Sequence, residues 1–295
     1  KYDNEIQKLK EKNRYFASFI IFIFCIICFF SSLSRNKTIT RGRALKRGKK
    51  YMKQCFEGKL LNNNTNILSE NPKISVVIPV YNCEKTIKFS VRSIQNQNMA
   101  DIEIILVNDN SKDNTSLIIK ELAEEDQRIK LIYNEKNMAT LYSRNIGILN
   151  SKGKYIMNLD NDDLFMDNDV FDTVYEEAEK NNYDMVGFGA IDCDTYNPAI
   201  KDMREGMFHS HKDGLTVLQP DLTYFAITVN GEFEQNDLHV WGRLTKTELY
   251  KNAINNFGLN AVGEKRNISF LTWAEDSAMS MALFRYAKSY KFIKK

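Results

Sequence analysis

Short runs of buried-type residues alternate with helical patterns from residue 74 onward, and this alternation limits the possible folds more than any other feature. Ile74–Val80 is a β-branched run, and Ile87, Val91 and Ile94 follow it at the i, i+4, i+7 spacing of one helix face. A second such run covers Ile102–Val107. Strands that alternate with helices are typical of βα units, whose strands pair in parallel.

The same rhythm continues along the chain. Further strands are predicted at 129–133, 155–159 and 184–188, and helices at 138–150 and 170–178. The predicted fold is therefore α/β, with a Rossmann-like, mostly parallel sheet flanked by helices. In such sheets ligands bind beyond the carboxyl ends of the strands.

Three carboxylates follow the strand predicted at 155–159, namely Asp160, Asp162 and Asp163. Carboxylates that are packed together repel and raise one another's pKa unless a cation lies between them. Hard divalent ions such as Mg²⁺ and Mn²⁺ favour carboxylate and phosphate oxygens. The cluster therefore predicts a divalent metal at this strand end. A solvated acidic turn at the start of the next helix is the alternative.

An apolar run without charged residues covers residues 16–33. At about 1.5 Å per residue, a helix of this length roughly spans the hydrocarbon core of a bilayer. We expect one transmembrane helix here, after an N-terminal flank at 1–15, and a cleaved signal peptide is the alternative. Residues 34–71 read as a basic and polar linker, and residues 72–295 as one folded domain.

The basic residues beside the apolar run predict its orientation. Five Lys or Arg residues precede the run and nine follow it, up to Lys53. Because positively charged flanks stay on the cytoplasmic side, we expect the folded domain to face the cytosol. A luminal orientation, in the ER or Golgi, is the alternative, and occupied glycosylation sequons would establish it.

Charge separates the two parts of the chain. Residues 1–53 carry 14 Lys and Arg against three acids, whereas residues 54–295 carry 27 against 35, a net charge of −8. Affinity for nucleic acids depends largely on clustered Lys and Arg, so the acidic domain argues against DNA or RNA as a partner. The five cysteines match neither a zinc spacing nor a disulfide framework.

Five separated motifs occur in order along the domain: 76–82 (VVIPVYN), 107–115 (VNDNSKDNT), 143–147 (SRNIG) with 153–156 (GKYI), 160–163 (DNDD) and 274–276 (AED). Together they resemble the family 2 glycosyltransferases, which have the GT-A fold. The resemblance covers about residues 72–290. It implies an enzyme whose donor is a nucleotide-activated sugar.

The resemblance implies roles on the donor side. Pro79 and Tyr81 lie along the nucleotide base, and Asp109 accepts a hydrogen bond from the uracil imide. Asn108 stands where the family usually has a first acid. Arg144 matches the family's arginine near the nucleotide, and its fixed fork of donors suits a carboxylate or phosphate. The structural alternatives are an ordinary strand exit, a helix cap at Asp109 and a surface salt bridge at Arg144.

The resemblance also implies catalytic roles. Asp160 is the carboxylate on the ribose side, and Asp162 is the direct metal ligand. Glu275 and Asp276 resemble the catalytic Glu-Asp motif, in which Asp276 is the general base that deprotonates the acceptor hydroxyl. Trp241 lies near the acceptor and would stack on a sugar face. An acidic first turn of a helix and a core tryptophan are the respective alternatives.

The predicted protein is a membrane-anchored, metal-dependent, inverting glycosyltransferase that transfers a sugar from a nucleotide-sugar, a UDP-sugar, to a glycan or lipid acceptor. Its expected cofactor is Mn²⁺ or Mg²⁺. A nucleotidyltransferase is disfavoured because no Gly-rich loop and lysine follow the first strand. A catalytically silent homologue that serves as a membrane-tethered binding module is the alternative. The chain stops 19 residues after Asp276, so we expect the domain to be truncated at its C-terminus.

Overall fold

The computed structural model describes residues 68–191, 208–209, 216–218, 239–257 and 275–293. The chain divides into two units, Lys1–Lys37 and Thr38–Lys295, and every described residue belongs to the second. The predicted flank, the predicted transmembrane helix and most of the predicted linker lie outside the described residues. Within the described ranges, no helix combines the length and apolar character that a membrane span requires.

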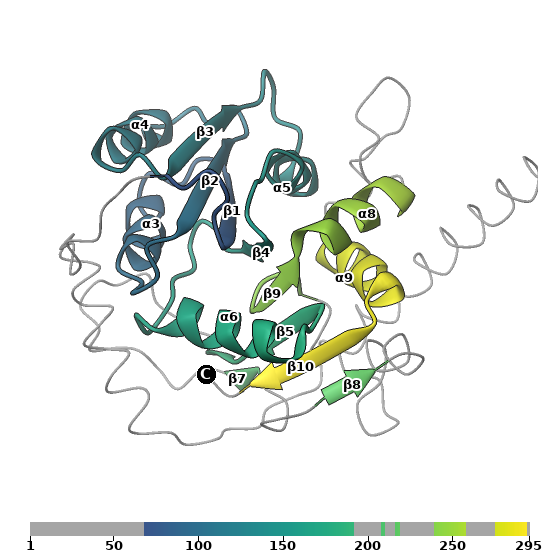
Figure 1. Ribbon diagram of the computed structural model, residues 1–295. Helices are drawn as coiled ribbons and strands as arrows, with labels where there is room; N and C mark the ends of the chain where they lie inside the picture. Colours follow the sequence, from purple (N-terminus) through teal and green to yellow (C-terminus); the bar gives the residue numbers. More distant parts are fainter. Residues whose placement is uncertain (1–67, 192–207, 210–215, 219–238, 258–274, 294–295) are drawn as a thin grey trace, which may run out of the picture. The chain divides into compact units, whose positions relative to one another are not determined.

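Four strands form the parallel half of a mixed sheet (Figure 1). They are β1 (Ile74–Val80), β2 (Ile102–Asn108), β3 (Ile129–Tyr133) and β4 (Tyr155–Asn158). In the sheet they stand in the order β3-β2-β1-β4, and each neighbouring pair is parallel. All residues of β1 and β2 are buried, which explains why both read as continuous apolar runs.

The other half of the sheet consists of four strands: β5 (Met185–Phe188), β8 (Thr216–Leu218), β9 (Arg243–Lys246) and β10 (Ser289–Ile293). The complete order is β3-β2-β1-β4-β9-β5-β10-β8. β9 is antiparallel to both of its neighbours, β10 is parallel to β5, and β8 is antiparallel to β10. A separate antiparallel pair joins β6 (Ala190–Ile191) and β7 (Phe208–His209).

Helices cover both faces of the sheet (Figure 1). One hydrophobic core includes residues of α3 (Ile87–Gln95), α4 (Thr115–Glu125) and α6 (Val170–Asn181). The second core includes residues of α5 (Thr140–Leu149), α8 (Thr247–Phe257) and α9 (Glu275–Tyr286). Because side chains alternate along a strand, Val76 and Ile78 of β1 enter the first core and Val77 enters the second. The predicted α/β fold with a mostly parallel, helix-flanked sheet is confirmed.

A glycine lets α5 approach the sheet closely. A Cβ atom on Gly147 would lie 2.5 Å from Cγ1 of Val77 and 3.1 Å from Cγ2 of Val107. Real Cβ atoms do not approach other atoms so closely, so any side chain here would push α5 away from β1 and β2. Gly147 therefore fixes the distance between the sheet and the helix that carries Arg144.

Glu103, at the amino end of β2, holds a turn with its buried carboxylate. The residue is 1% exposed. Its Oε1 accepts hydrogen bonds from the Ser75 hydroxyl at 2.5 Å, the Lys152 N–H at 2.5 Å and the Gly153 N–H at 3.1 Å. These bonds fix the turn between α5 and β4, at the edge of the sheet opposite to the strand ends that carry the acidic motif.

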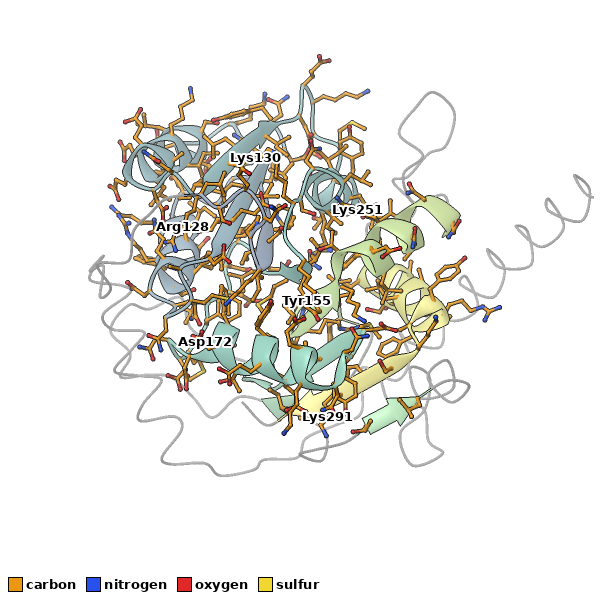
Figure 2. All side chains as sticks on the ribbon, viewed as in Figure 1. Arg128, Lys130, Tyr155, Asp172, Lys251 and Lys291 are labelled. Carbon is orange, nitrogen blue, oxygen red and sulfur yellow. The ribbon has the colours of Figure 1, made fainter. Side chains whose placement is uncertain are left out.

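A buried ion pair connects α3, α4 and β3 (Figure 2 labels Arg128). Arg128 donates from Nη2 to Oδ2 of Asp126 at 2.8 Å and from Nε to Oδ1 at 3.0 Å. Gln95 donates to Oδ2 of the same carboxylate at 3.0 Å. Burial alone would raise the pKa of Asp126, but the hydrogen bonds and charge of Arg128 lower it. The pair satisfies two groups that would otherwise be costly to bury.

Candidate active site

The carboxyl ends of β1, β2 and β3 lie level at one edge of the sheet. Val80 pairs with Asn108, and Asn108 pairs with Tyr133. β4 lies beside β1 and ends at Asn158. The segments that leave these four strands therefore start from the same edge, where parallel sheets bind ligands.

Arg144 joins two acidic motifs that are far apart in the sequence. Its side chain is 1% exposed. Nη2 donates to Oδ1 of Asp160 at 2.8 Å, and Nη1 donates to Oδ1 of Asp276 at 2.6 Å. The two carboxylates stay partly exposed, at 34% for Asp160 and 25% for Asp276. Because the arginine is buried between its partners, it does not form the surface salt bridge that was the alternative reading.

The environment of Asp160 raises its pKa. Burial is the main cause, and the negative charges of Asp276 and Asp162 add to it, while the charge of Arg144 acts in the opposite direction. Three carboxylates and one buried arginine thus share this part of the edge. Their net negative charge favours a cation or a hydrogen-bond donor as a ligand.

The turn after β4 is bonded to neighbouring segments through the side chain and the carbonyl group of Asn161. Asn161 donates from Nδ2 to the Pro79 carbonyl oxygen at 3.1 Å, and its own carbonyl accepts from the Ser90 hydroxyl at 3.0 Å. This arrangement leaves Asp162 and Asp163 exposed. The turn therefore presents two adjacent carboxylates beside a strand end.

The donor chemistry of this turn fits a hard divalent ion. Among the described residues, no group of three or more His, Cys, Asp or Glu side chains is placed to hold a metal by itself. Mg²⁺, however, is usually bound by one or two carboxylates together with substrate phosphates. The exposed Asp162 matches that requirement, and the role predicted for it as a metal ligand stays a prediction.

Asp109 is a buried carboxylate whose hydrogen-bond partners lie in the segment after β3. The residue is 3% exposed. Oδ1 accepts from Asn134 Nδ2 at 2.7 Å and from the Met138 N–H at 2.8 Å, and Oδ2 accepts from the Ala139 N–H at 2.8 Å. It is therefore not a cap of α4, the helix that follows it. The predicted contact with a uracil imide is not tested by these bonds.

Ala139 has an unusual backbone conformation. Its φ of 69° and ψ of 167° lie in a region that is essentially restricted to glycine, at a cost of about 1–3 kcal/mol for other residues. Ala139 directly precedes α5. A strained residue thus stands where the chain turns from β3 into the helix of Arg144.

Pro79 and Tyr81 lie at the carboxyl end of β1 and differ in exposure. Pro79 lies within β1 and pairs with Val107, whereas Tyr81 is 44% exposed at the strand end. The loop after Tyr81 is bonded to the loop after β2: the Asn82 N–H donates to Ser111 Oγ at 3.1 Å, and Asn82 Oδ1 accepts from the Lys112 N–H at 2.8 Å. The exposed tyrosine ring therefore stands on a cross-linked pair of loops.

A buried polar pair behind the arginine was not predicted from the sequence. Asn158 Nδ2 donates to the hydroxyl of Tyr250 at 2.9 Å, and the two residues are 2% and 0% exposed. Burial raises the pKa of Tyr250, while the charges of Arg144 and Asp276 lower and raise it, respectively. The tyrosine hydroxyl is thus close enough to both charged groups for them to affect its pKa.

The remaining predicted residues are placed as follows. Trp241 is partly buried, stacks on His239 with ring centroids 4.3 Å apart, and bridges to Asn158 through its backbone. Glu275 is the first residue of α9, and its side chain lies outside the described residues. The predicted roles of Trp241 and Glu275 stay predictions.

The comparison with protein families decides the classification of this site. Residues 75–251, more than half of the chain, match the family model of glycosyl transferase family 2. This chain belongs to glycosyl transferase family 2. The resemblance stated from the motifs is therefore confirmed. The matched residues include the ends of β1, β2 and β4 and the first five residues of α8.

Curated relatives and solved structures agree with this family 2 assignment. The uncharacterized glycosyltransferase EpsJ of Bacillus subtilis is 30% identical over 234 residues, which are 75% of this chain and 59% of EpsJ. A Campylobacter jejuni GalNAc(5)-diNAcBac-PP-undecaprenol beta-1,3-glucosyltransferase is 36% identical over 93 residues, 31% of this chain and 30% of the relative. The S. aureus TarS 1-349 structure in complex with UDP-GlcNAc has a TM-score of 0.55 and 18% identity over 76% of this chain and 56% of TarS 1-349.

The likeness to TarS shows the fold of this family 2 chain. The chain spans less than two thirds of the length of each of these relatives.

Proposed function

We propose that this family 2 protein transfers a sugar from a nucleotide-sugar, a UDP-sugar, to a hydroxyl group of a glycan or lipid acceptor with inversion at the anomeric carbon. The observation that carries the proposal is the buried Arg144, which holds Asp160 and Asp276 together at the ligand-binding edge of the sheet. TarS, with the same fold, has been solved in complex with UDP-GlcNAc, which supports a uridine nucleotide as the donor.

The acceptor side of the mechanism depends on Asp276. An inverting displacement needs a base opposite the leaving diphosphate, and a carboxylate can take the proton as the hydroxyl oxygen attacks the anomeric carbon. Arg144 binds Oδ1 of Asp276 and thereby orients the carboxylate. Its Oδ2 is the proposed proton acceptor. Glu275, its neighbour at the start of α9, is proposed to assist at the same end.

The donor side uses residues that follow β1 and β4 at the same edge. The exposed ring of Tyr81, with Pro79 behind it, is proposed to lie along the nucleotide base, and Asp160 is proposed to accept a hydrogen bond from the ribose. Asp162 would hold Mg²⁺ or Mn²⁺ together with the diphosphate. The bound metal would offset the negative charge that builds on the leaving diphosphate.

A lipid-linked acceptor and a membrane location are also part of the proposal. The Campylobacter relative is named for an acceptor on PP-undecaprenol and for a beta-1,3 linkage. The apolar run at 16–33 and the basic residues after it would place the domain at a membrane surface, on the cytosolic side. Protease protection tests this orientation in sealed vesicles whose cytosolic face is outward. Added protease should cleave the domain in intact vesicles, and cleavage only after the vesicles are lysed would contradict the cytosolic orientation.

Replacement of the proposed base tests the mechanism. We expect Asp276→Asn to abolish sugar transfer while UDP binding, measured by calorimetry, is preserved. Asp172→Asn is the matched control, because it makes the same change on α6, which packs on the other face of the sheet (Figure 2). An Asp276→Asn protein that transfers sugar at close to the wild-type rate would refute the role of Asp276.

A further inference from the structure

The carboxylate of Asp109 is bound by a single loop. All three of its side-chain hydrogen bonds come from the segment 134–139, which connects β3 to α5. Two of the donors are backbone N–H groups, so the bonds fix the path of the chain rather than one side chain. The carboxylate is 3% exposed. Its geometry is that of a group that holds a loop in place.

The held loop contains a residue that would otherwise adopt a different conformation. Ala139 has φ 69° and ψ 167°, and its N–H donates to Oδ2 of Asp109 at 2.8 Å. A strained conformation persists only where its surroundings enforce it. The Ala139 N–H also donates to Oδ1 of Asn137, at the longer distance of 3.2 Å. The shorter bonds from Met138 and Ala139 to Asp109 are the main enforcement.

The same loop determines where Arg144 is presented. Asn134 donates from Nδ2 both to Asp109 and to the hydroxyl of Ser143, the latter at 2.9 Å. Ser143 directly precedes Arg144, and its N–H donates to the Ala139 carbonyl at 3.2 Å in the first turn of α5. A change in the loop at 134–139 would therefore move the start of the helix that carries the buried arginine.

We propose that Asp109 is a positioning residue, which enforces the strained turn at Ala139 and thereby sets the place of Arg144 beside Asp160 and Asp276. This inference rests on the proposed function, in which Asp160 binds the ribose and Asp276 is the base. Asp109 thereby influences nucleotide binding through the loop, apart from any contact with the base. This part of its effect should depend on the strain at Ala139.

The test combines three substitutions in the whole 295-residue chain. Asp109→Asn replaces one acceptor oxygen by an NH₂ group that faces N–H donors. Ala139→Gly removes the backbone strain in the wild-type and in the Asp109→Asn background. Asn134→Ala leaves the carboxylate intact but removes one donor and the bond to Ser143, so it keeps the test decisive if Asp109→Asn fails to fold.

The first measurement is the affinity for UDP in Mg²⁺ buffer by calorimetry. We expect Asp109→Asn to weaken binding by about tenfold or more, Ala139→Gly to restore at least about threefold of that loss, and Asn134→Ala to weaken binding by about threefold or more. Unchanged affinity in Asn134→Ala, or no restoration by Ala139→Gly, would overturn the inference.

Glu103→Gln is the matched control. It weakens a similar clamp between a buried carboxylate and backbone N–H groups on the same strand, but at the opposite end of β2. It should lower the melting temperature and leave the UDP affinity within about twofold. A loss of affinity as large as that of Asp109→Asn would mean that general destabilisation explains the result, which would overturn the inference.

The melting temperature separates this inference from the proposed function. Ala139→Gly should raise the melting temperature more in the wild type, where the strain is enforced, than in Asp109→Asn, where the loop can relax. This measurement needs no nucleotide, and equal gains in the two backgrounds would overturn the inference. If the gains differ as expected but the wild-type protein binds no UDP, the proposed function is contradicted instead.

Discussion

Removal of the guanidinium of Arg144 should destabilise the fold and change how its stability depends on pH. Arg144→Met keeps most of the side-chain volume but leaves Asp160 and Asp276 without the cation that bonds both at 2.8 and 2.6 Å. Breaking a buried ion pair by removing one partner costs about 3–5 kcal/mol. Because the two carboxylates are 34% and 25% exposed, water screens part of this loss, and we expect about 2 kcal/mol.

The sign of the pH dependence follows from Asp160. Its pKa in the folded protein is raised by burial, so the folded state binds the proton more tightly than the unfolded state does. This group therefore favours folding at low pH, and its contribution is lost as the pH rises from about 4 through the folded pKa. Without the charge of Arg144, the pKa of Asp160 in the folded protein rises further. Stability is then lost over a range of pH that extends to higher values.

Thermal melting of the wild type and Arg144→Met checks this reasoning. A loss of about 2 kcal/mol corresponds to about 4–8 °C for a domain of this size. We expect that difference at about pH 7.5 and a clearly smaller one at about pH 4.5, where Asp160 of the variant takes up a proton. An equal difference at both pH values would refute the electrostatic explanation, and no difference at either would show that the pair is not formed.

Three further changes have expected outcomes that melting curves can check. Gly147→Ala should destabilise by about 1–3 kcal/mol, because the new Cβ would lie 2.5 Å from Val77; a neutral effect would mean that α5 can shift freely. Asp126→Ala should cost about 3 kcal/mol or more, because the guanidinium of Arg128 stays buried without its partner; a loss below about 1 kcal/mol would contradict this. Tyr250→Phe should cost about 1–2 kcal/mol, because Asn158 loses its acceptor, and an unchanged melting temperature would show that this bond contributes nothing.

Local patterns predicted the parallel half of the sheet, in which β1, β2 and β4 are buried along their whole length. β1 and β2 read as strands from their apolar residues alone. β9 was not predicted, since Arg-Leu-Thr-Lys at 243–246 shows no apolar run. It enters the sheet through Leu244, which pairs with Met157 on one side and Val186 on the other. Such a placement depends on pairing between distant segments, which a local pattern does not encode.

The candidate site shows the same division. The acidic turn after β4 was predictable because the carboxylates follow a strand directly in the sequence. The bond from Arg144 to Asp276 joins residues 132 positions apart and was not predicted, because the family motifs named both residues without pairing them. The turn at Ala139 gave no signal, because an alanine does not indicate a conformation that favours glycine. Tyr250 and Asn158 were missed because single polar residues beside apolar ones look like ordinary surface positions.

The most direct test of the proposed function is metal-dependent hydrolysis of nucleotide-sugars. A panel of UDP-, GDP- and dTDP-sugars would be incubated with the wild-type chain and with Asp162→Ala, with Mn²⁺, with Mg²⁺ and with a chelator. We expect UDP to be released from one UDP-sugar only when a divalent ion is present, and the release to be lost in Asp162→Ala. Absence of release from every donor, by a protein that melts cooperatively, would contradict the proposal that this chain is an active sugar transferase.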